Sequence, residues 1–156
     1  MHNSVYYKYS DYLKSKYHAK VYKIPVNIGG TCPNRDGNKG YGGCIFCPEG
    51  GTGYELLEKT VPLNIQIERN IAYIRAKYKA EKYIIYFGDY SSTYMEKDKF
   101  LSIMQSAAGY SEDIAGICLS TRPDCISDEY LDILKAISHK YSVDIYIELG
   151  LQSSND

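Results

Sequence analysis

Apolar residues gather in four short runs along the chain, separated by segments in which apolar positions recur with helical spacing. The runs occupy residues 21–28, 82–87, 114–120 and 143–149. They are rich in β-branched and aromatic residues, as strands are, and KYIIYF at 82–87 is nearly continuously apolar, which is typical of a strand covered on both faces. Helical spacing is found in residues 62–79, 97–108 and 127–139, and a shorter helix is expected around residues 10–17.

The alternation of strands and helices predicts the fold class. Consecutive parallel strands need a helical crossover, so an order in which each strand is followed by a helix indicates an α/β fold built from parallel β/α units. No internal repeat or low-complexity linker divides the chain. We therefore expect one core domain over residues 21–156, preceded by a basic, tyrosine-rich arm over residues 1–20.

The composition is that of a globular protein, with 156 residues, 44% hydrophobic and 24% charged, and a formal net charge of −1. Such a charge argues against a protein that binds polyanions by bulk charge alone. No apolar run reaches the roughly 18 residues of a transmembrane helix. The N-terminus lacks the apolar core of a secretory signal. These features predict a soluble, cytoplasmic protein with no membrane partner.

Glycines and cysteines are concentrated between the first strand and the first long helix. Nine of the 13 glycines lie between Gly29 and Gly53, and three of the five cysteines follow the spacing Cys32-x11-Cys44-x2-Cys47. An odd cysteine count in a chain without an export signal disfavours a disulfide framework, whereas clustered thiols in a reducing compartment are metal ligands or catalysts. The segment begins just beyond a strand, so its thiols are expected at the carboxyl edge of the sheet, where α/β proteins bind ligands.

Three cysteines, rather than four, favour a metal centre with an open position. A structural zinc ion takes four protein ligands, whereas a 4Fe-4S cluster held by three cysteines leaves one iron able to bind another molecule. A zinc ion completed by a distant histidine or aspartate is the alternative that the residues leave open. Cys118 and Cys125 are interpreted as small core residues.

The segment GGTCPNRDGNKGYGGCIFCPEGGTG strongly resembles the cluster loop of radical S-adenosyl-L-methionine enzymes, in particular a bacterial group related to the Elongator catalytic subunit. Three further segments, YFGDYSSTY, CLSTRPDC and IELGLQSSND, are similar to the ends of the next three strands in that group. The gap of 11 residues between the first two cysteines departs from the C-x3-C-x2-C spacing of many superfamily members. The resemblance covers nearly the whole chain and is specific for the superfamily rather than for a substrate.

This resemblance implies an enzyme. Cys32, Cys44 and Cys47 would each bind one iron of a 4Fe-4S cluster, and the fourth iron would chelate S-adenosyl-L-methionine. Reduction by a one-electron donor of the flavodoxin or ferredoxin type would cleave that molecule to methionine and a 5′-deoxyadenosyl radical, which takes a hydrogen atom from the substrate. RNA, and tRNA in particular, is the candidate substrate by analogy with the Elongator group, and the lysines and tyrosines near the N-terminus are compatible with it.

The resemblance also implies contacts to S-adenosyl-L-methionine. Phe46 matches the position beside the adenine, and the backbone of residues 87–89 follows the second strand where the methionine ammonium is held. A guanidinium at the end of the third strand suits a carboxylate, and polar residues at the end of the fourth strand suit ribose hydroxyls. The expected cofactor-binding residues are Phe46, Phe87, Gly88, Asp89, Ser120, Arg122, Glu148 and Gln152.

Simpler interpretations remain for some of these residues. Asp89 is equally explained as a turn residue after its strand, and Arg122 as a partner in a surface ion pair. Glu148 lies within an apolar strand, where an unpaired carboxylate would be costly, and this favours a functional role. For the chain as a whole, the alternative is a zinc-bound nucleic-acid-binding module without catalysis.

Four strands are fewer than the six of the partial (β/α)6, TIM-type barrel that the resemblance implies. We therefore expect the chain to correspond to the N-terminal half of that barrel. A truncated form of this kind is expected to hold a cluster weakly and to turn over little or no substrate.

Overall fold

A computed structural model of the chain describes residues 5–45, 47 and 57–150. The helices and strands follow one another in the predicted order, each boundary within about two residues of its expected position. They are α1 Tyr9–Tyr17, β1 Val21–Val26, α2 Leu63–Tyr78, β2 Lys82–Phe87, α3 Lys97–Ala108, β3 Ile114–Thr121, the single 3-10 turn η1 Pro123–Cys125, α4 Asp128–Tyr141 and β4 Asp144–Leu149. The connection between β1 and α2, residues 27–62, is here named the cysteine loop.

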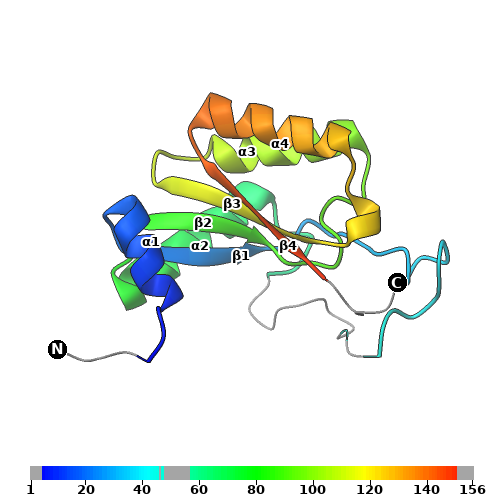
Figure 1. Cartoon of the computed structure of the whole chain (residues 1–156), viewed down its shortest axis with the longest axis horizontal. Coiled ribbons are helices and arrows are strands. Elements are labelled where there is room, and N and C mark those ends of the chain that lie inside the picture. Colours follow the sequence, from blue (N-terminus) through cyan, green and yellow to red (C-terminus); the bar gives the residue numbers. More distant parts are fainter. Residues whose placement is uncertain (1–4, 46, 48–56, 151–156) are drawn as a thin grey trace.

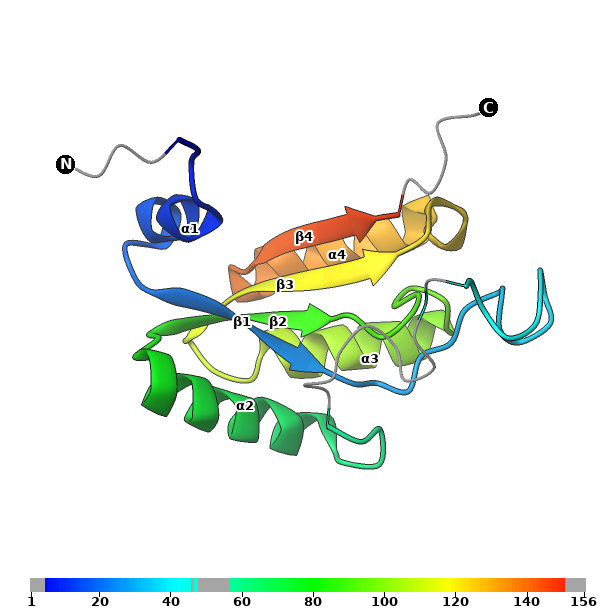
Figure 2. The ribbon, with the colours of Figure 1, turned by 90° about the horizontal axis from the view of Figure 1, so that it is seen from below.

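The four strands form one parallel sheet in the order β1-β2-β3-β4 (Figure 1). Spatial order equals chain order, as in a β/α barrel, whereas a doubly wound sheet reverses its order part-way. The predicted α/β class with parallel β/α units is confirmed. Figure 2 shows all four strands pointing toward the cysteine loop, which lies at the carboxyl edge of the sheet.

The sheet is covered on both faces, but by different elements. On one face, α2, α3 and α4 bury the main core, in which Ile24, Ile85 and Ile117 from adjacent strands are completely inaccessible to solvent. On the opposite face, here named the α1 face, Leu13 of α1 packs on Ile84. Because neighbouring residues of a strand point to opposite faces, each strand supplies apolar side chains to the helices and a second set to the α1 face.

Two boundary residues differ in detail from expectation. The predicted first strand ran to Ile28, but β1 ends at Val26 because the next amide, that of Asn27, donates to the side chain of Gln66 rather than to a strand. Ser127 occupies the predicted position before α4, yet its hydroxyl makes no capping hydrogen bond. In the described part of the chain, no helix is long and apolar enough to cross a membrane.

Candidate functional site

The three cysteines singled out in the sequence all lie in the cysteine loop, at the carboxyl edge of the sheet. Cys32, Cys44 and Cys47 are each half-buried. The amide of Cys47 donates to the carbonyl of Cys44 at 2.9 Å, which forms a tight turn, and the Nδ2 of Asn34 donates to the Cys44 Sγ at 3.3 Å. None of the five cysteines, all of which the structure describes, forms a disulfide.

These thiols share a loop but do not converge on one point. Among the described residues, no three His, Cys, Asp or Glu side chains are arranged to hold a metal ion. The chemistry of the donor set nevertheless fits an iron-sulfur cluster, because three thiols outside disulfides stand in one glycine-rich loop. Cys118 and Cys125 lie outside this loop, and Cys118 is buried between α1 and the sheet, in agreement with its interpretation as a core residue.

The start of the cysteine loop is held by Asp89, from the connection that follows β2. Its Oδ2 accepts hydrogen bonds from the amides of Ile28 at 3.1 Å and Gly30 at 2.8 Å. The side chain is only 2% exposed, and among the described residues its Oδ1 has no hydrogen-bond partner. Burial raises the pKa of Asp89, and the amides of Gly30 and Ile28 oppose that rise.

The two ends of the cysteine loop are joined by Gln66 of α2. This buried side chain accepts from the amide of Asn27 and donates to the carbonyls of Asn27 and Val61, each at 2.8 Å. Asn27 is the first residue of the loop and Val61 its last residue but one. Gln66 therefore closes the loop at its base with every polar atom of its side chain satisfied.

Further along, the cysteine loop is tied to the ends of β2 and β3. Asp124 in η1 receives both the guanidinium of Arg122, through two hydrogen bonds of 2.8 Å, and the ammonium of Lys39 from the loop. These hydrogen bonds hold the pKa of Asp124 well below its usual range. The Nδ2 of Asn38 donates to the hydroxyl of Tyr94 at 3.0 Å.

Arg122 is therefore engaged in an ion pair, the simpler of the two interpretations made from the sequence. The pair leaves open whether its guanidinium also meets a ligand. Phe87, another expected cofactor contact, has its side chain completely buried beneath the helices, and its carbonyl accepts the hydroxyl of Ser92 at 2.8 Å. Phe46 and Gln152 lie outside the described residues.

The α1 face carries a polar cluster in its carboxyl half, here named the inner polar cluster: Lys23, Tyr86, Cys118, Ser120 and Glu148. Glu148 is its centre, because its carboxylate accepts from Lys23 Nζ at 2.5 Å, Ser120 Oγ at 3.1 Å and Cys118 Sγ at 3.5 Å. The hydroxyls of Tyr86 and Ser120 are 3.0 Å apart.

Electrostatics within the inner polar cluster favour a charged Glu148. Burial alone would raise the pKa of Glu148, but the ammonium of Lys23 and the hydroxyl of Ser120 outweigh it, and the pKa is lowered. Burial raises the pKa of Cys118 to about 11, so this thiol stays protonated near neutral pH. The cluster thus offers a carboxylate acceptor and hydroxyl groups beside an ammonium.

The structure brings together two residues that the sequence assigned to the same ligand, Ser120 and Glu148. It adds Lys23 and Tyr86, which the sequence analysis missed. Strand alternation offered a signal, since Lys23 falls between the apolar positions Tyr22 and Ile24 and must therefore point away from the helices.

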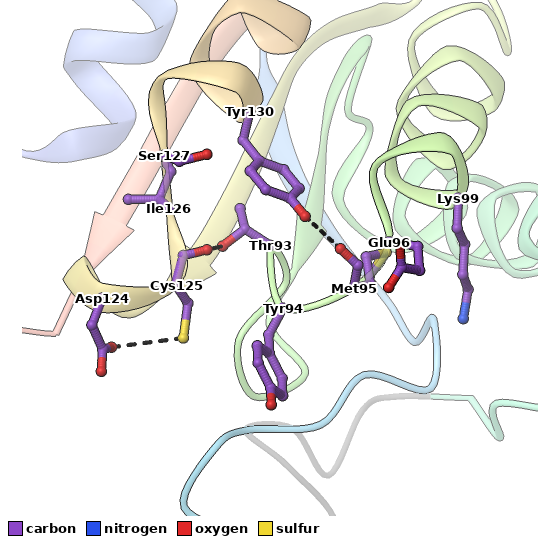
Figure 3. A pocket seen from close by; sticks show the side chains of 10 residues that line it. All are labelled: Thr93, Tyr94, Met95, Glu96, Lys99, Asp124, Cys125, Ile126, Ser127 and Tyr130. Atoms are coloured by element: carbon purple, nitrogen blue, oxygen red, sulfur yellow. Dashed lines mark hydrogen bonds between the residues drawn. The ribbon is translucent and has the colours of Figure 1, made fainter. Parts of the chain in front are cut away.

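A separate pocket of about 680 Å³ opens between the start of α3 and η1 (Figure 3). The thiol of Cys125, the hydroxyl of Tyr94 and the side chain of Lys99 line it. Its walls are braced by hydrogen bonds, of Thr93 Oγ1 to the carbonyl of Cys125 and of Tyr130 to the carbonyl of Met95, each at 2.5 Å. None of the residues assigned from the sequence lines this pocket.

No model of a protein family matches the chain. Curated relatives do match: the uncharacterized protein MJ0486 of Methanocaldococcus jannaschii is 38% identical over 149 residues, protein YhcC of Escherichia coli 34% over 145, and the uncharacterized protein YtqA of Bacillus subtilis 32% over 155. The alignments cover 92–97% of this chain but only 44–46% of the relatives. The chain therefore spans about half the length of the curated relatives it matches, and their names assign no activity.

Proposed function

We propose that this chain forms the cluster-binding part of a radical S-adenosyl-L-methionine enzyme. The observation that carries the proposal is the position of Cys32, Cys44 and Cys47: three half-buried thiols in one loop at the carboxyl edge of a parallel sheet. Ligands of α/β proteins bind at that edge, and three thiolates suit a cluster that keeps one iron open.

The three thiolates would hold the 4Fe-4S cluster, and the bound cluster would supply an open iron and the electron that cleaves S-adenosyl-L-methionine. The protein's own task is to bind and orient the cofactor and to exclude water. Ser120 and Glu148 offer a hydroxyl and a carboxylate that suit the ribose hydroxyls, and Lys23 keeps the Glu148 carboxylate charged. The backbone of residues 88 and 89 is proposed to meet the methionine ammonium.

The partners belong to the same proposal. A one-electron donor of the flavodoxin or ferredoxin type would reduce the cluster, and RNA is the proposed substrate. What supports RNA is the outer side of α1 and the segment before it, where Tyr6 and Tyr7 are each 70% exposed near Lys8 and Lys14. Lys16, in contrast, pairs with Asp144 at 3.0 Å and is expected to contribute less to RNA affinity.

The test is anaerobic reconstitution of the chain with iron and sulfide, followed by iron and sulfide analysis and by EPR with and without S-adenosyl-L-methionine. Alanine replaces Cys32, Cys44 and Cys47 one at a time. Cys118→Ala and Cys125→Ala are matched controls, because they remove a thiol outside the cysteine loop. We expect a reduced cluster signal that shifts on addition of the cofactor, is lost in the three loop variants and persists in both controls.

Other results would contradict the proposal in recognisable ways. One zinc ion per chain and no cluster would favour the zinc-bound nucleic-acid module instead. A cluster that also depends on Cys125 would mean four protein ligands and no open iron, which removes the basis for cofactor binding.

A further inference from the structure

Asp89 is the residue with the most unusual environment near the cysteine loop. It is a carboxylate that is almost completely buried, and one of its oxygens accepts two backbone amides of the loop while the other has no hydrogen-bond partner among the described residues. We propose that Asp89 is a positioning residue, which fixes the start of the cysteine loop and thereby the place of Cys32, and that it does not itself touch a bound cofactor.

The hydrogen bonds at the start of the loop form a continuous set. The amides of Ile28 and Gly30 donate to Asp89, and the intervening amide of Gly29 donates to the side chain of Asn27 at 2.9 Å. Gly29 has a φ of +66°, which turns the chain so that the amides on either side face the same carboxylate oxygen. Three consecutive amides are therefore fixed by side chains.

Close packing reinforces these hydrogen bonds. A Cβ added at Gly30 would lie 3.0 Å from the carbonyl oxygen of Asp89 and 3.2 Å from its Oδ2, closer than side-chain carbons normally approach. One residue further, the carbonyl of Thr31 accepts the amide of Ser91 at 3.3 Å. Residues 28–31 thus lie along the connection that follows β2.

Cys32 follows this fixed segment directly. Its carbonyl accepts the amides of Arg35 at 2.8 Å and Asp36 at 3.3 Å, so the thiol stands between a segment held by Asp89 and a hydrogen-bonded turn. The backbone of Cys32 has little freedom on either side. Loss of the Asp89 carboxylate would release the segment before it and leave only the turn after it.

The burial of Asp89 argues against direct contact with a cofactor. A side chain that is 2% exposed beneath the loop has no open surface toward a bound molecule, and its Oδ2 already accepts two donors. The significance of Cys32 rests on the proposed function, but the positioning role of Asp89 can be tested without any iron.

The experiment compares Asp89→Ala and Asp89→Asn with the unchanged chain and with Ser92→Ala. Ser92 lies in the same connection and is also buried, but its hydroxyl bonds to the carbonyl of Phe87 and not to the cysteine loop. Two properties of the iron-free chain are measured: hydrogen exchange at the amides of Ile28 and Gly30, and the rate at which iodoacetamide alkylates Cys32.

We expect exchange at these two amides to become at least about tenfold faster in Asp89→Ala, since a hydrogen bond to a buried charged acceptor is lost. Asp89→Asn should fall between Asp89→Ala and the unchanged chain, because a neutral amide oxygen is a weaker acceptor than a carboxylate. Alkylation of Cys32 should follow the same order, while alkylation of Cys125 stays constant and Ser92→Ala resembles the unchanged chain. If Asp89→Ala fails to fold, the Asn variant decides by itself.

Unchanged exchange at Ile28 and Gly30 in both Asp89 variants would overturn the positioning role. So would a variant with unchanged Cys32 reactivity that, after reconstitution, loses the effect of S-adenosyl-L-methionine on the EPR signal, because Asp89 would then act on the ligand. Failure of the chain to take up iron would refute the proposed function, yet exchange and alkylation would still decide the role of Asp89.

Discussion

Gln66 offers a direct test of how the base of the cysteine loop contributes to stability. Replacement by leucine keeps a side chain of similar size and removes all three hydrogen bonds, each 2.8 Å long, that join Asn27 to Val61. Gln66 is 1% exposed, so water does not reach these groups in the folded chain. The variant would leave one amide and two carbonyls without a partner.

The expected loss follows from the number of bonds. A net value of about 1 kcal/mol for each hydrogen bond gives about 3 kcal/mol, and the greater apolarity of leucine in a buried position offsets a part of it. We expect the free energy of unfolding to fall by about 2–3 kcal/mol. For a chain of this size, that corresponds to a decrease in Tm of roughly 4–12 °C.

Urea unfolding followed by circular dichroism measures this change. The midpoint should fall while the slope m stays constant, because the folded and unfolded surfaces remain the same. Gln105→Leu is the matched control: the residue is a half-buried glutamine on α3 for which the structure gives no side-chain hydrogen bond. That control should change the free energy of unfolding by less than about 0.5 kcal/mol.

A loss below about 1 kcal/mol in Gln66→Leu would refute the reasoning. It would mean that water or a shift of the loop satisfies the amide and carbonyls of Asn27 and Val61, and that Gln66 does not close the loop. A lower m in the variant would carry a different message, because the loop would then already be open in the folded state.

Two further predictions concern α1 and η1. Tyr17→Phe removes the hydroxyl that lies 2.5 Å from Asp144 and 2.6 Å from the hydroxyl of Tyr146, and should destabilise the chain by about 1 kcal/mol and speed tryptic cleavage within α1; unchanged cleavage would mean that these bonds do not hold the helix. The pKa of Asp124 is depressed by Arg122, so its carboxylate stabilises the folded chain above the unfolded pKa and this contribution is lost as the pH falls through the folded value. Asp124→Asn should therefore be less stable than the unchanged chain by under about 1 kcal/mol from pH 5 to 8, with a gap that narrows below about pH 4 in urea unfolding at each pH; a gap that widens in acid would contradict the assignment.

Much of the fold could be predicted from local pattern. Helix α3 begins at Lys97 and ends at Ala108, as expected from its apolar spacing and from Gly109, which follows it. The strand 82–87 has the predicted limits. Such features depend on neighbouring residues alone, because the helical and extended periods repeat within a few positions. Where β1 stops, in contrast, depends on a side chain 39 residues away, that of Gln66.

The candidate site could be predicted only in part. Clustering in sequence placed Cys32, Cys44 and Cys47 in one loop, and the parallel sheet placed that loop at the carboxyl edge. The choice between ligand contact and structural role for Asp89 could not be made, since it depends on burial beneath residues that precede it by about 60 positions. Arg122 was equally ambiguous until its pairing with Asp124 was seen.

By itself, the sequence determined the alternation of strands and helices, the place of the thiols along the chain and the identity of the groups available for chemistry. Only the tertiary structure decided which groups meet. Lys23 and Glu148 are 125 residues apart on the two outer strands, and on a flat sheet of this register their Cα atoms would be about 19 Å apart, farther than the two side chains reach. Their ion pair therefore requires the strong twist of the four-stranded sheet, which is a property of the assembled strands and of no single segment.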